Sequence, residues 1–329
     1  MKILFAIQGT GNGHLARARE IIPLLRQYGE LDILISGTQA EVLPDDPIAY
    51  RYHGFSFIFG KKGGVDHWQT YKTMNLSLLW RDIRSLPLKN YNLIVNDFEP
   101  VTAWACRLQG RPSVALSHQA SFLSQNTPRP GKSSQYSEWI FKHYAPTTHQ
   151  IGFHFQEYDS FIHTPVIRSE IRRQEVKNLG HISVYLPAYH DQFLLNYLHK
   201  IPEVRWEVFS KHTRNCYTEK NVRVQPVNNG HFNVSLANSA GLLTGGGFEG
   251  PAEALFLKKK LFVIPMRNQY EQLCNAEAAR RMGIPVVHQV NEDVVLKLKQ
   301  WLNNKDLPAV NFPDKTANIV EEMVNKYRN

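Results

Sequence analysis

The chain has 329 residues, which suits two domains of ordinary size, and its 43% hydrophobic and 20% charged residues are typical of a globular protein. The net charge of +9 suits an anionic partner, but the basic residues are spread along the chain and form no known nucleic-acid module, so no nucleic-acid partner is expected. The 3 cysteines lie far apart, which excludes a disulfide framework or a zinc spacing, and the lack of a signal-peptide pattern or a membrane-spanning apolar run predicts a cytoplasmic location.

The N-terminal stretch predicts a βαβ unit that opens a doubly wound sheet. Residues 3–7 form a continuous apolar run, as in a parallel strand buried on both faces, and residues 31–35 form another. Between them, apolar residues recur at helical spacing from Leu15, and Pro23 is expected to kink that helix. The connecting loop, GTGNGH, lacks the G-x-G-x-x-G spacing, and no carboxylate ends the second strand, so a nicotinamide-binding site is not expected.

Polar side chains follow three strands of this predicted sheet, at the edge where ligands bind in open α/β sheets. His14 ends the glycine loop, Asp97 follows the apolar residues 93–95, and His118 follows another short apolar run. A histidine needs only a small environmental shift to accept a proton near neutral pH, so His14 is the candidate general base. The structural alternatives are that His14 bonds locally at its helix start, that Asp97 caps the following helix, and that His118 is an ordinary loop residue.

Residues 60–89 interleave basic and aromatic side chains, and Leu76, Leu79, Trp80 and Ile83 can share one helix face. We favour a solvated helix that packs on the sheet. Contact with an anionic membrane surface is the alternative.

A proline-containing segment followed by a charged run, residues 164–177, marks the expected boundary between two domains. The predicted divisions are an N-terminal domain over residues 1–165 with its last strand at 151–155, a second domain over 166–312, and a terminal helix within 313–329. Strand and helix patterns also alternate in the second half, which predicts another parallel α/β sheet. Its predicted strands are 181–186, 205–210, 222–225, 240–243 and 261–264.

The stretch from residue 242 to 276, LLTGGGFEGPAEALFLKKKLFVIPMRNQYEQLCNA, has the order of a ligand cradle. An apolar strand is followed by three glycines, and Pro251 stands where a helix begins, a position that favours proline. A glycine turn before a helix lets an anion approach backbone N–H groups at the positive end of the helix dipole. A second strand ends at Pro265, and Glu271 and Gln272 follow it. An ordinary strand–turn–helix unit is the alternative.

This order resembles the donor-sugar signature of GT-B glycosyltransferases, and is similar to that of the UDP-glycosyltransferases and the lipid-linked GlcNAc transferase of peptidoglycan assembly. The resemblance implies an α/β protein with two Rossmann-like, doubly wound parallel-sheet domains facing across a cleft, and a terminal helix that returns to the first domain. It implies inverting, metal-independent transfer of a sugar from a nucleotide-sugar, by default a UDP-sugar, to an acceptor hydroxyl. A lipid-linked acceptor and peripheral contact with the inner membrane face are options. The nucleotide-sugar is a co-substrate, and no cofactor is expected.

The resemblance also implies roles for individual residues. His14 is the base, and a carboxylate on a neighbouring loop orients it, with Asp97 as the best match and Glu99 as the alternative. Glu253 binds both ribose hydroxyls, a task that suits a carboxylate because it accepts from both. The candidates for contacting the donor are Thr244, Gly245, Gly246, Gly247, Phe248, Glu249, Gly250, Glu253, Glu271 and Gln272, the last two through sugar hydroxyls. The candidates for contacting the acceptor or a phosphate are Gly11, Asn12, Gly13 and His118.

The chain departs from the family pattern at two positions. Many members carry His or Arg in place of Gly245 to bind the diphosphate, and Glu249 adds a negative charge to the turn. Backbone amides or another residue must then compensate, and the side-chain candidates are Thr244, Lys211 and Arg267. Two other functions stay open: a sugar-nucleotide epimerase or hydrolase on the same fold, and a non-catalytic sugar-nucleotide binder.

Overall fold

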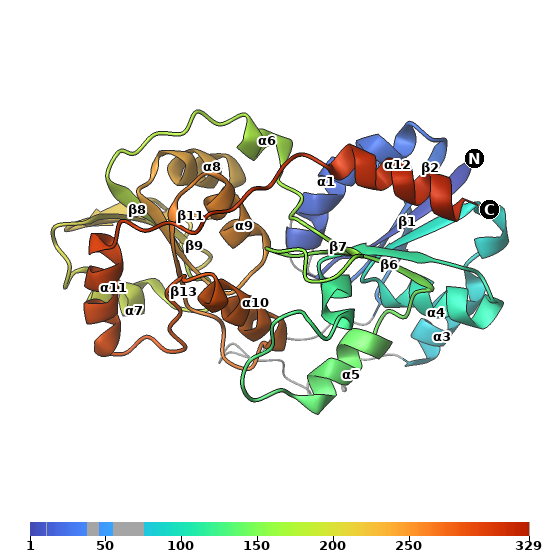
Figure 1. Cartoon of the computed structure of the whole chain (residues 1–329), viewed down its shortest axis with the longest axis horizontal. Helices are drawn as coiled ribbons and strands as arrows, with labels where there is room; N and C mark the ends of the chain where they lie inside the picture. The colour runs from blue at the N-terminus through green and yellow to red at the C-terminus, as the bar shows by residue number, and fades with distance from the viewer. Residues whose placement is uncertain (11, 38–45, 55–75, 329) are drawn as a thin grey trace.

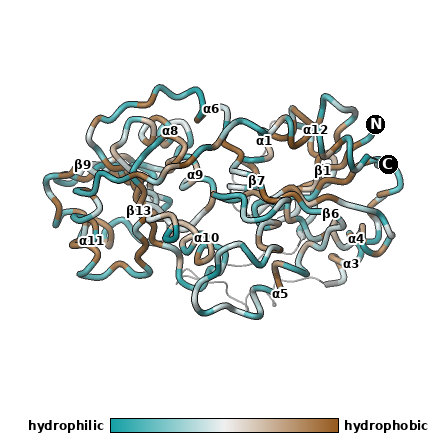
Figure 2. The backbone as a smooth tube through the Cα atoms, viewed as in Figure 1, coloured by the Kyte–Doolittle hydropathy of each residue, from teal (hydrophilic) through white to brown (hydrophobic). Residues whose placement is uncertain are grey.

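The structure, a computed structural model, describes residues 1–10, 12–37, 46–54 and 76–328. It contains two sheets, and helices lie on both sides of each (Figure 1). Hydrophobic residues concentrate in the strands, whereas outer loops and helix faces carry most of the hydrophilic ones (Figure 2). This distribution is the one expected of parallel strands that are covered on both faces. The predicted α/β class with two doubly wound sheets is confirmed.

The first sheet has 7 parallel strands in the order β3-β2-β1-β4-β5-β6-β7. Its strands are β1 (Lys2–Gln8), β2 (Glu30–Ser36), β3 (Ile48–Tyr52), β4 (Leu93–Asp97), β5 (Val114–Ser117), β6 (His149–Phe153) and β7 (Ile162–His163). The helical segments of this half are α1 (Asn12–Arg26), α3 (Leu76–Ser85), η1 (Leu88–Asn90), α4 (Pro100–Gln109), η2 (Gln119–Leu123) and α5 (Gln135–His143).

The second sheet has 6 strands in the order β10-β11-β9-β8-β12-β13, with only the edge strand β10 antiparallel among them. Its strands are β8 (His181–Tyr185), β9 (Arg205–Ser210), β10 (Tyr217–Glu219), β11 (Val222–Pro226), β12 (Gly241–Thr244) and β13 (Lys260–Val263). The helices of this half are α6 (Ser169–Arg172), α7 (Asp191–Leu198), α8 (Asn229–Asn238), α9 (Glu249–Phe256), α10 (Tyr270–Arg281) and α11 (Asp293–Asn303), and α12 (Thr316–Tyr327) ends the chain.

Both sheets contain the strand order of a doubly wound fold, in which the order reverses beside the first strand of each. In the first sheet this switch point lies between β1 and β4, where Ile7 pairs with Asp97. In the second it lies between β8 and β12, where Tyr185 pairs with Thr244. Because ligands bind at the carboxyl ends of strands beside such points, these two edges are where a site is expected.

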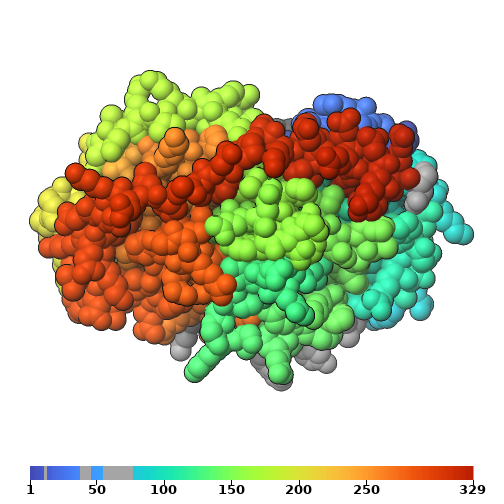
Figure 3. All heavy atoms as spheres, viewed as in Figure 1, coloured from blue at the N-terminus to red at the C-terminus, as the bar shows by residue number. Residues whose placement is uncertain are grey.

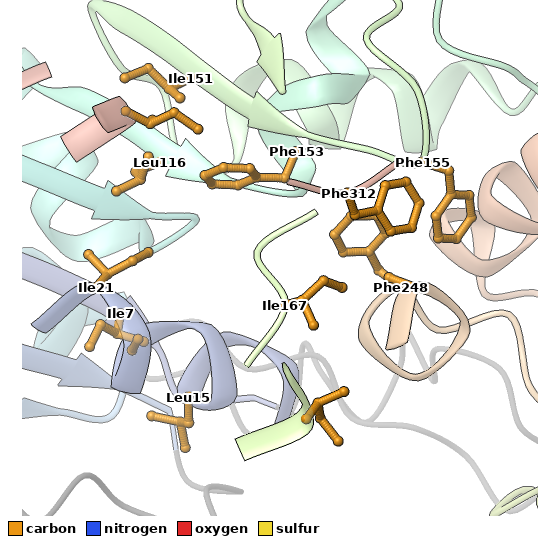
Figure 4. Close-up of a cluster of buried hydrophobic side chains, with 14 of the residues drawn as sticks. Ile7, Leu15, Ile21, Leu116, Ile151, Phe153, Phe155, Ile167, Phe248 and Phe312 are labelled. Carbon is orange, nitrogen blue, oxygen red and sulfur yellow. The ribbon is translucent and has the colours of Figure 1, made fainter. Parts of the chain in front are cut away.

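One continuous hydrophobic cluster joins the two halves. Figure 4 shows Phe155, which follows β6, beside Phe248 at the start of α9, with ring centroids 5.2 Å apart, and Phe153 of β6 belongs to the same cluster. Ile167 of the crossover and Phe312 of the C-terminal segment lie in the same cluster. Since all five side chains are buried, separating the halves would expose apolar surface to water.

The C-terminal segment runs back from the second half to the first (Figure 3). It leaves α11, crosses the surface and ends in α12, which packs against α1 (Figure 1). Tyr327 of α12 stacks on His149 of β6 with ring centroids 4.3 Å apart. The terminal helix therefore contacts the first sheet, and the chain crosses between the halves twice.

Pro23 lies inside α1, which continues to Arg26, and the kink expected there stays a prediction. Two details differ from the sequence expectations. The last strand of the first sheet is the short β7, so the expectation for residues 151–155 was wrong. In α3, Ile83 is buried whereas Trp80 is 48% exposed, so the expected shared face is only partly covered. Residues 60–75 of the basic and aromatic segment lie outside the described residues.

Candidate active site

A cavity of about 420 Å³ lies where the carboxyl ends of the two sheets face each other. The start of α1 forms one wall, and the glycine turn with α9 forms another. The cavity volume is in the range of small-ligand sites. The predicted site residues that line it are Gly13, Thr244, Gly245, Gly247, Phe248, Glu249, Gly250, Glu253 and Gln272.

His14 and Asp97 form a direct contact at the first sheet's edge. His14 Nδ1 lies 2.9 Å from Asp97 Oδ1, because α1 starts at the carboxyl end of β1 and Asp97 ends the adjacent β4. Since the carboxylate only accepts, Nδ1–H donates and Nε2 keeps its lone pair. Burial acts to raise the pKa of Asp97, but Arg17 and His14 outweigh it and hold that pKa below its ordinary value. Asp97 therefore remains a carboxylate that can orient the imidazole.

Glu99 has a different set of partners. It is the N-cap of α4 and accepts hydrogen bonds from Val101 N at 2.7 Å and Thr102 N at 2.6 Å. Ser36 Oγ also donates to it, at 2.6 Å. Glu99 thus does the capping that was considered for Asp97, and of the two carboxylates Asp97 is the one that contacts His14.

Arg17 connects this pair to the second half of the molecule. Its Nη2 donates to both oxygens of Asp97, at 2.7 and 2.9 Å, and its Nη1 donates to Glu249 Oε1 at 2.8 Å. The side chain is 2% exposed. Burial acts to lower the pKa of Arg17, but the charges of Asp97 and Glu249 outweigh it, so the guanidinium keeps its charge. The negative charge expected of Glu249 is therefore balanced from the opposite wall.

The second ring nitrogen of His14 faces η2. Gln119 Nε2 lies 3.5 Å from His14 Nε2 and donates to Glu271 Oε2 at 3.1 Å. The amide of Gln119 thus lies between the candidate base and one member of the predicted sugar-binding pair. The contact to His14 is long, so a substrate hydroxyl could replace it at Nε2.

The glycine turn supplies fewer open amides than its sequence indicates. Gly245 N donates to Tyr185 O at 3.3 Å, and Gly246 N donates to Gln272 Oε1 at 3.1 Å. Among the described residues, the N–H groups of Gly247, Phe248 and Glu249 have no acceptor. An anion at this turn would therefore meet the amides at the start of α9 rather than all three glycines.

Gln272 and Asn275 hold the turn in place. Gln272 Oε1 also accepts from Met266 N at 2.9 Å, so its carbonyl is fully used inside the protein. Asn275 Nδ2 donates to Gly246 O at 3.1 Å, and its Oδ1 lies 2.9 Å from His118 Nε2. Both side chains thus bond the turn's backbone, and Asn275 extends that contact to the first half.

The structure buries His118 between the two halves. Its Nδ1 lies 2.8 Å from Phe153 O, and its ring stacks on Phe248 with centroids 3.8 Å apart. Burial lowers the pKa of His118 to about 3 and outweighs the two oxygen acceptors beside the ring, so the ring is neutral and only one of its nitrogens carries a hydrogen to donate. With the ring 1% exposed and each nitrogen beside a protein oxygen, His118 presents no open atom to an acceptor or phosphate, and its position is that of an interface residue.

Glu253 is paired with an arginine from the crossover segment. Arg168 donates from Nε to Oε1 at 2.5 Å and from Nη2 to Oε2 at 2.8 Å. Burial acts to lower the pKa of Arg168, but the hydrogen bonds and charge of Glu253 outweigh it and raise that pKa. Burial also raises the pKa of Glu253 against the opposing effect of Arg168, and the two short hydrogen bonds from a guanidinium favour the ionised pair. Each carboxylate oxygen can accept more than one hydrogen bond, so this pairing leaves Glu253 able to accept ribose hydroxyls.

Away from the turn, the cavity is lined by Tyr185, Tyr189 and Phe232, which form an apolar wall suited to a planar ring. Of the three side chains considered as replacements for the missing cation, Lys211 and Thr244 line the cavity and Arg267 does not. The Thr244 hydroxyl donates to Tyr185 O at 3.1 Å.

Gly11 lies outside the described residues, and Asn12 is the first residue of α1. Within the described chain, no group of three or more His, Cys, Asp or Glu side chains is arranged to hold a metal ion. None of the helices that the structure describes is long and apolar enough to cross a membrane.

Sequence reasoning did not assign roles to Arg17, Gln119 and Arg168. Arg17 follows His14 by three residues, so helical spacing places both on one face, and this signal was available. Gln119 directly follows His118, one of the predicted site residues. Arg168 carries no local signal, since its partner Glu253 is 85 residues away.

Comparison with solved structures places this geometry in a known fold. MurG of Acinetobacter baumannii shares 15% identity at a TM-score of 0.62, covering 98% of this chain and 99% of that one. A UDP-glucosyltransferase from Polygonum tinctorium shares 13% identity at a TM-score of 0.61, covering 100% of this chain and 98% of that one. SsfS6 of Streptomyces sp. SF2575, solved with thymidine diphosphate, shares 9% identity at a TM-score of 0.60, covering 100% and 96%.

These structures are GT-B glycosyltransferases, which confirms the predicted fold. A comparison with curated protein sequences finds no match. The family model for glycosyl transferase family 1 matches residues 1–304. The chain therefore belongs to glycosyl transferase family 1, and it is a glycosyltransferase.

Proposed function

We propose that this glycosyltransferase inverts the anomeric centre as it transfers a sugar from a UDP-sugar to an acceptor hydroxyl, without a metal ion. The observation that supports this most is the His14–Asp97 contact of 2.9 Å beside a cavity shared by both sheets. The contact leaves Nε2 of His14 as a proton acceptor, as a general base requires.

In the proposed reaction, the acceptor O–H gives its proton to His14 Nε2 while its oxygen forms a bond to the anomeric carbon. The bond from that carbon to the phosphate oxygen breaks on the opposite face, and its electron pair leaves with the nucleoside diphosphate. Asp97 stabilises the imidazolium that forms, since its carboxylate accepts from Nδ1–H throughout.

The departing diphosphate needs positive partners. The N–H groups of Gly247, Phe248 and Glu249 lie at the positive end of the α9 dipole, and Lys211 lines the same cavity. Preorganised donors of this kind stabilise charge that develops in the transition state. We therefore propose that these groups take the part that a metal ion has in other transferases, and expect transfer to persist in a chelator.

For the donor, we propose that the base stacks on the aromatic wall and that the ribose hydroxyls bind Glu253. UDP is the first nucleotide to test because one similar structure is a UDP-glucosyltransferase, and thymidine diphosphate is the second because another similar structure contains it. Thermal-shift screening with UDP, TDP and GDP ranks the bases. A larger shift with GDP than with either pyrimidine nucleotide would contradict the UDP assignment.

The transfer reaction is tested with a panel of sugar nucleotides, with and without hydroxyl acceptors. Nucleotide release that depends on acceptor, with the product's anomeric configuration inverted, is the expected result. Nucleotide release without an acceptor would indicate a hydrolase, and conversion of the sugar nucleotide to another one would indicate an epimerase. Binding of the sugar nucleotide without release would indicate a non-catalytic binder. A product that retains the configuration would contradict the single displacement.

We also propose a lipid-linked acceptor reached at an anionic membrane surface. Trp80 of α3 and Leu108 of α4 are 48% and 52% exposed beside a hollow that Arg84 and Lys89 also line. Exposed apolar and basic side chains together favour binding to an anionic interface. Co-sedimentation should therefore be stronger with anionic than with zwitterionic vesicles and weaker in W80A/R84A. W139A, which removes an exposed tryptophan of α5, is the control.

A further inference from the structure

We propose that Arg17 is a positioning residue that ties the His14–Asp97 pair to the opposite wall of the cavity through Glu249. The inference rests on the proposed function and names a further residue that it requires. The buried guanidinium of Arg17 contacts both halves of the molecule. Its partners are the carboxylates of Asp97 and Glu249, which lie 80 and 232 positions away in the sequence. Its Nη2 also lies 3.3 Å from His14 Nδ1, but the hydrogen of that nitrogen is directed at Asp97, so Arg17 acts on the imidazole through the carboxylate. Its side chain is 2% exposed and does not line the cavity.

Arg17 fixes the orientation of Asp97. Nη2 of Arg17 reaches both carboxylate oxygens, at 2.7 and 2.9 Å, and so fixes the plane of the carboxylate. Oδ1 is thereby held where it accepts from His14 Nδ1–H at 2.9 Å. A fixed acceptor at Nδ1 selects one neutral tautomer of His14, the one with Nε2 free to take a proton. Without Arg17, Asp97 would be free to rotate, and both tautomers would be populated.

Arg17 also contacts Glu249. This glutamate is the first residue of α9 and accepts from Arg17 Nη1 at 2.8 Å. A Cβ built on Gly13 would lie 2.6 Å from its Oε2, so the loop before His14 packs directly on this carboxylate. The start of α9, which offers amides to the donor, and the start of α1, which carries the base, are thus held together by one side chain. Assembly of the base and contact between the halves are therefore coupled.

The experiment compares R17M/E249Q with the wild-type protein. The double variant removes one positive and one negative charge, so the net charge is kept and no carboxylate loses its partner except Asp97, which retains His14. Three quantities are measured: the transfer rate at saturating donor, the Kd for UDP by calorimetry, and the His14 tautomer by long-range 1H–15N correlation in 15N-histidine-labelled protein. The His14 signal is assigned with H14Q. R26M, on the same helix at an exposed ion pair with Asp46, is the matched control.

We expect R17M/E249Q to bind UDP about as tightly as the wild type, to transfer about 100-fold more slowly, and to show a mixture of His14 tautomers. R17K should show a transfer rate and a tautomer mixture between those of the wild type and R17M/E249Q. A single ammonium cannot reproduce the fork geometry of the guanidinium that reaches both carboxylates. If the double variant does not fold, the tautomer spectrum of R17K decides. A single, unchanged tautomer in the folded variant, or transfer at the wild-type rate, would overturn the proposal.

The tautomer readout needs no turnover, so it separates this inference from the proposed function. If the wild-type protein transfers no sugar to any acceptor, the proposed function fails. The spectrum then still shows whether Arg17 positions His14.

Discussion

Arg168 donates two hydrogen bonds to Glu253, from Nε at 2.5 Å and from Nη2 at 2.8 Å, and both side chains are largely buried. The arginine comes from the crossover between the two sheets, and the glutamate comes from the helix that follows the glycine turn. A buried ion pair of this kind adds little net stability, but breaking it leaves an unpaired charge away from water. The pair therefore fixes the position of Glu253 in the cavity wall.

R168M should destabilise the protein by about 3 to 5 kcal/mol, because Glu253 is left buried without its partner. R168M/E253Q should recover part of that loss, since no charge is stranded. The measurement is the free energy of unfolding in urea. If the losses of unfolding free energy for R168M and E253Q add up to the loss for the double variant, the two residues are not coupled, contrary to the structure.

Neighbouring glycines of the turn should respond differently to alanine. A Cβ on Gly246 would lie 2.5 Å from Gln272 O, 2.9 Å from Gln272 Cβ and 3.0 Å from Pro265 Cβ, whereas a Cβ on Gly247 meets nothing within 4 Å. G246A should therefore cost about 1 to 3 kcal/mol of stability, and G247A should leave the thermal midpoint close to that of the wild type. Equal midpoints for the two variants would contradict the described packing of the turn on α10.

The burial of His118 between the two halves predicts that the folded protein loses stability in acid. Its pKa in the folded protein is about 3, below the ordinary value of 6.5, because it is buried. At pH values between these two pKa values, the unfolded chain binds more protons at His118 than the folded protein does. The stability contributed by the neutral ring is therefore present above pH 6.5 and is lost as the pH falls. Between about pH 6 and 4 the loss should approach 1.4 kcal/mol per pH unit for this residue.

H118Q should flatten that part of the pH–stability profile, even if it lowers stability at pH 7. H231Q, at an exposed histidine on α8, is the control and should keep the wild-type slope. His154 is also buried, and burial lowers its pKa too, so H118Q removes only part of the effect. A wild-type profile that is flat between pH 7 and 4 would rule out this account of His118.

The fold was largely predictable because most of its strands are parallel and buried on both faces, so they appear in the sequence as uninterrupted apolar runs. β1 and β12 are examples, each within one or two residues of its expected bounds. β7 has only two residues, and all three residues of β10 are exposed, so neither has an apolar run to detect. Their existence depends on the strands beside them rather than on their own sequence.

The site was predictable where a motif lies within one stretch of chain, as at His14 and the glycine turn. Side-chain partners far apart in the sequence were only partly accessible. Asp97 was matched to His14 through the family resemblance, but the Arg17–Glu249 and Arg168–Glu253 pairs depend on how the two sheets face each other. The use of Gly245 N and Gly246 N inside the protein is likewise visible only in three dimensions.

The proposed transfer reaction depends most on His14 as the base that takes the proton of the acceptor hydroxyl beside the donor cavity. The direct test is H14A, measured for sugar transfer and for UDP binding in the same preparation. We predict that transfer falls by about 100-fold or more while the Kd for UDP stays near the wild-type value, because the proposed nucleotide site lies in the second half. Transfer by H14A at the wild-type rate would contradict the central claim.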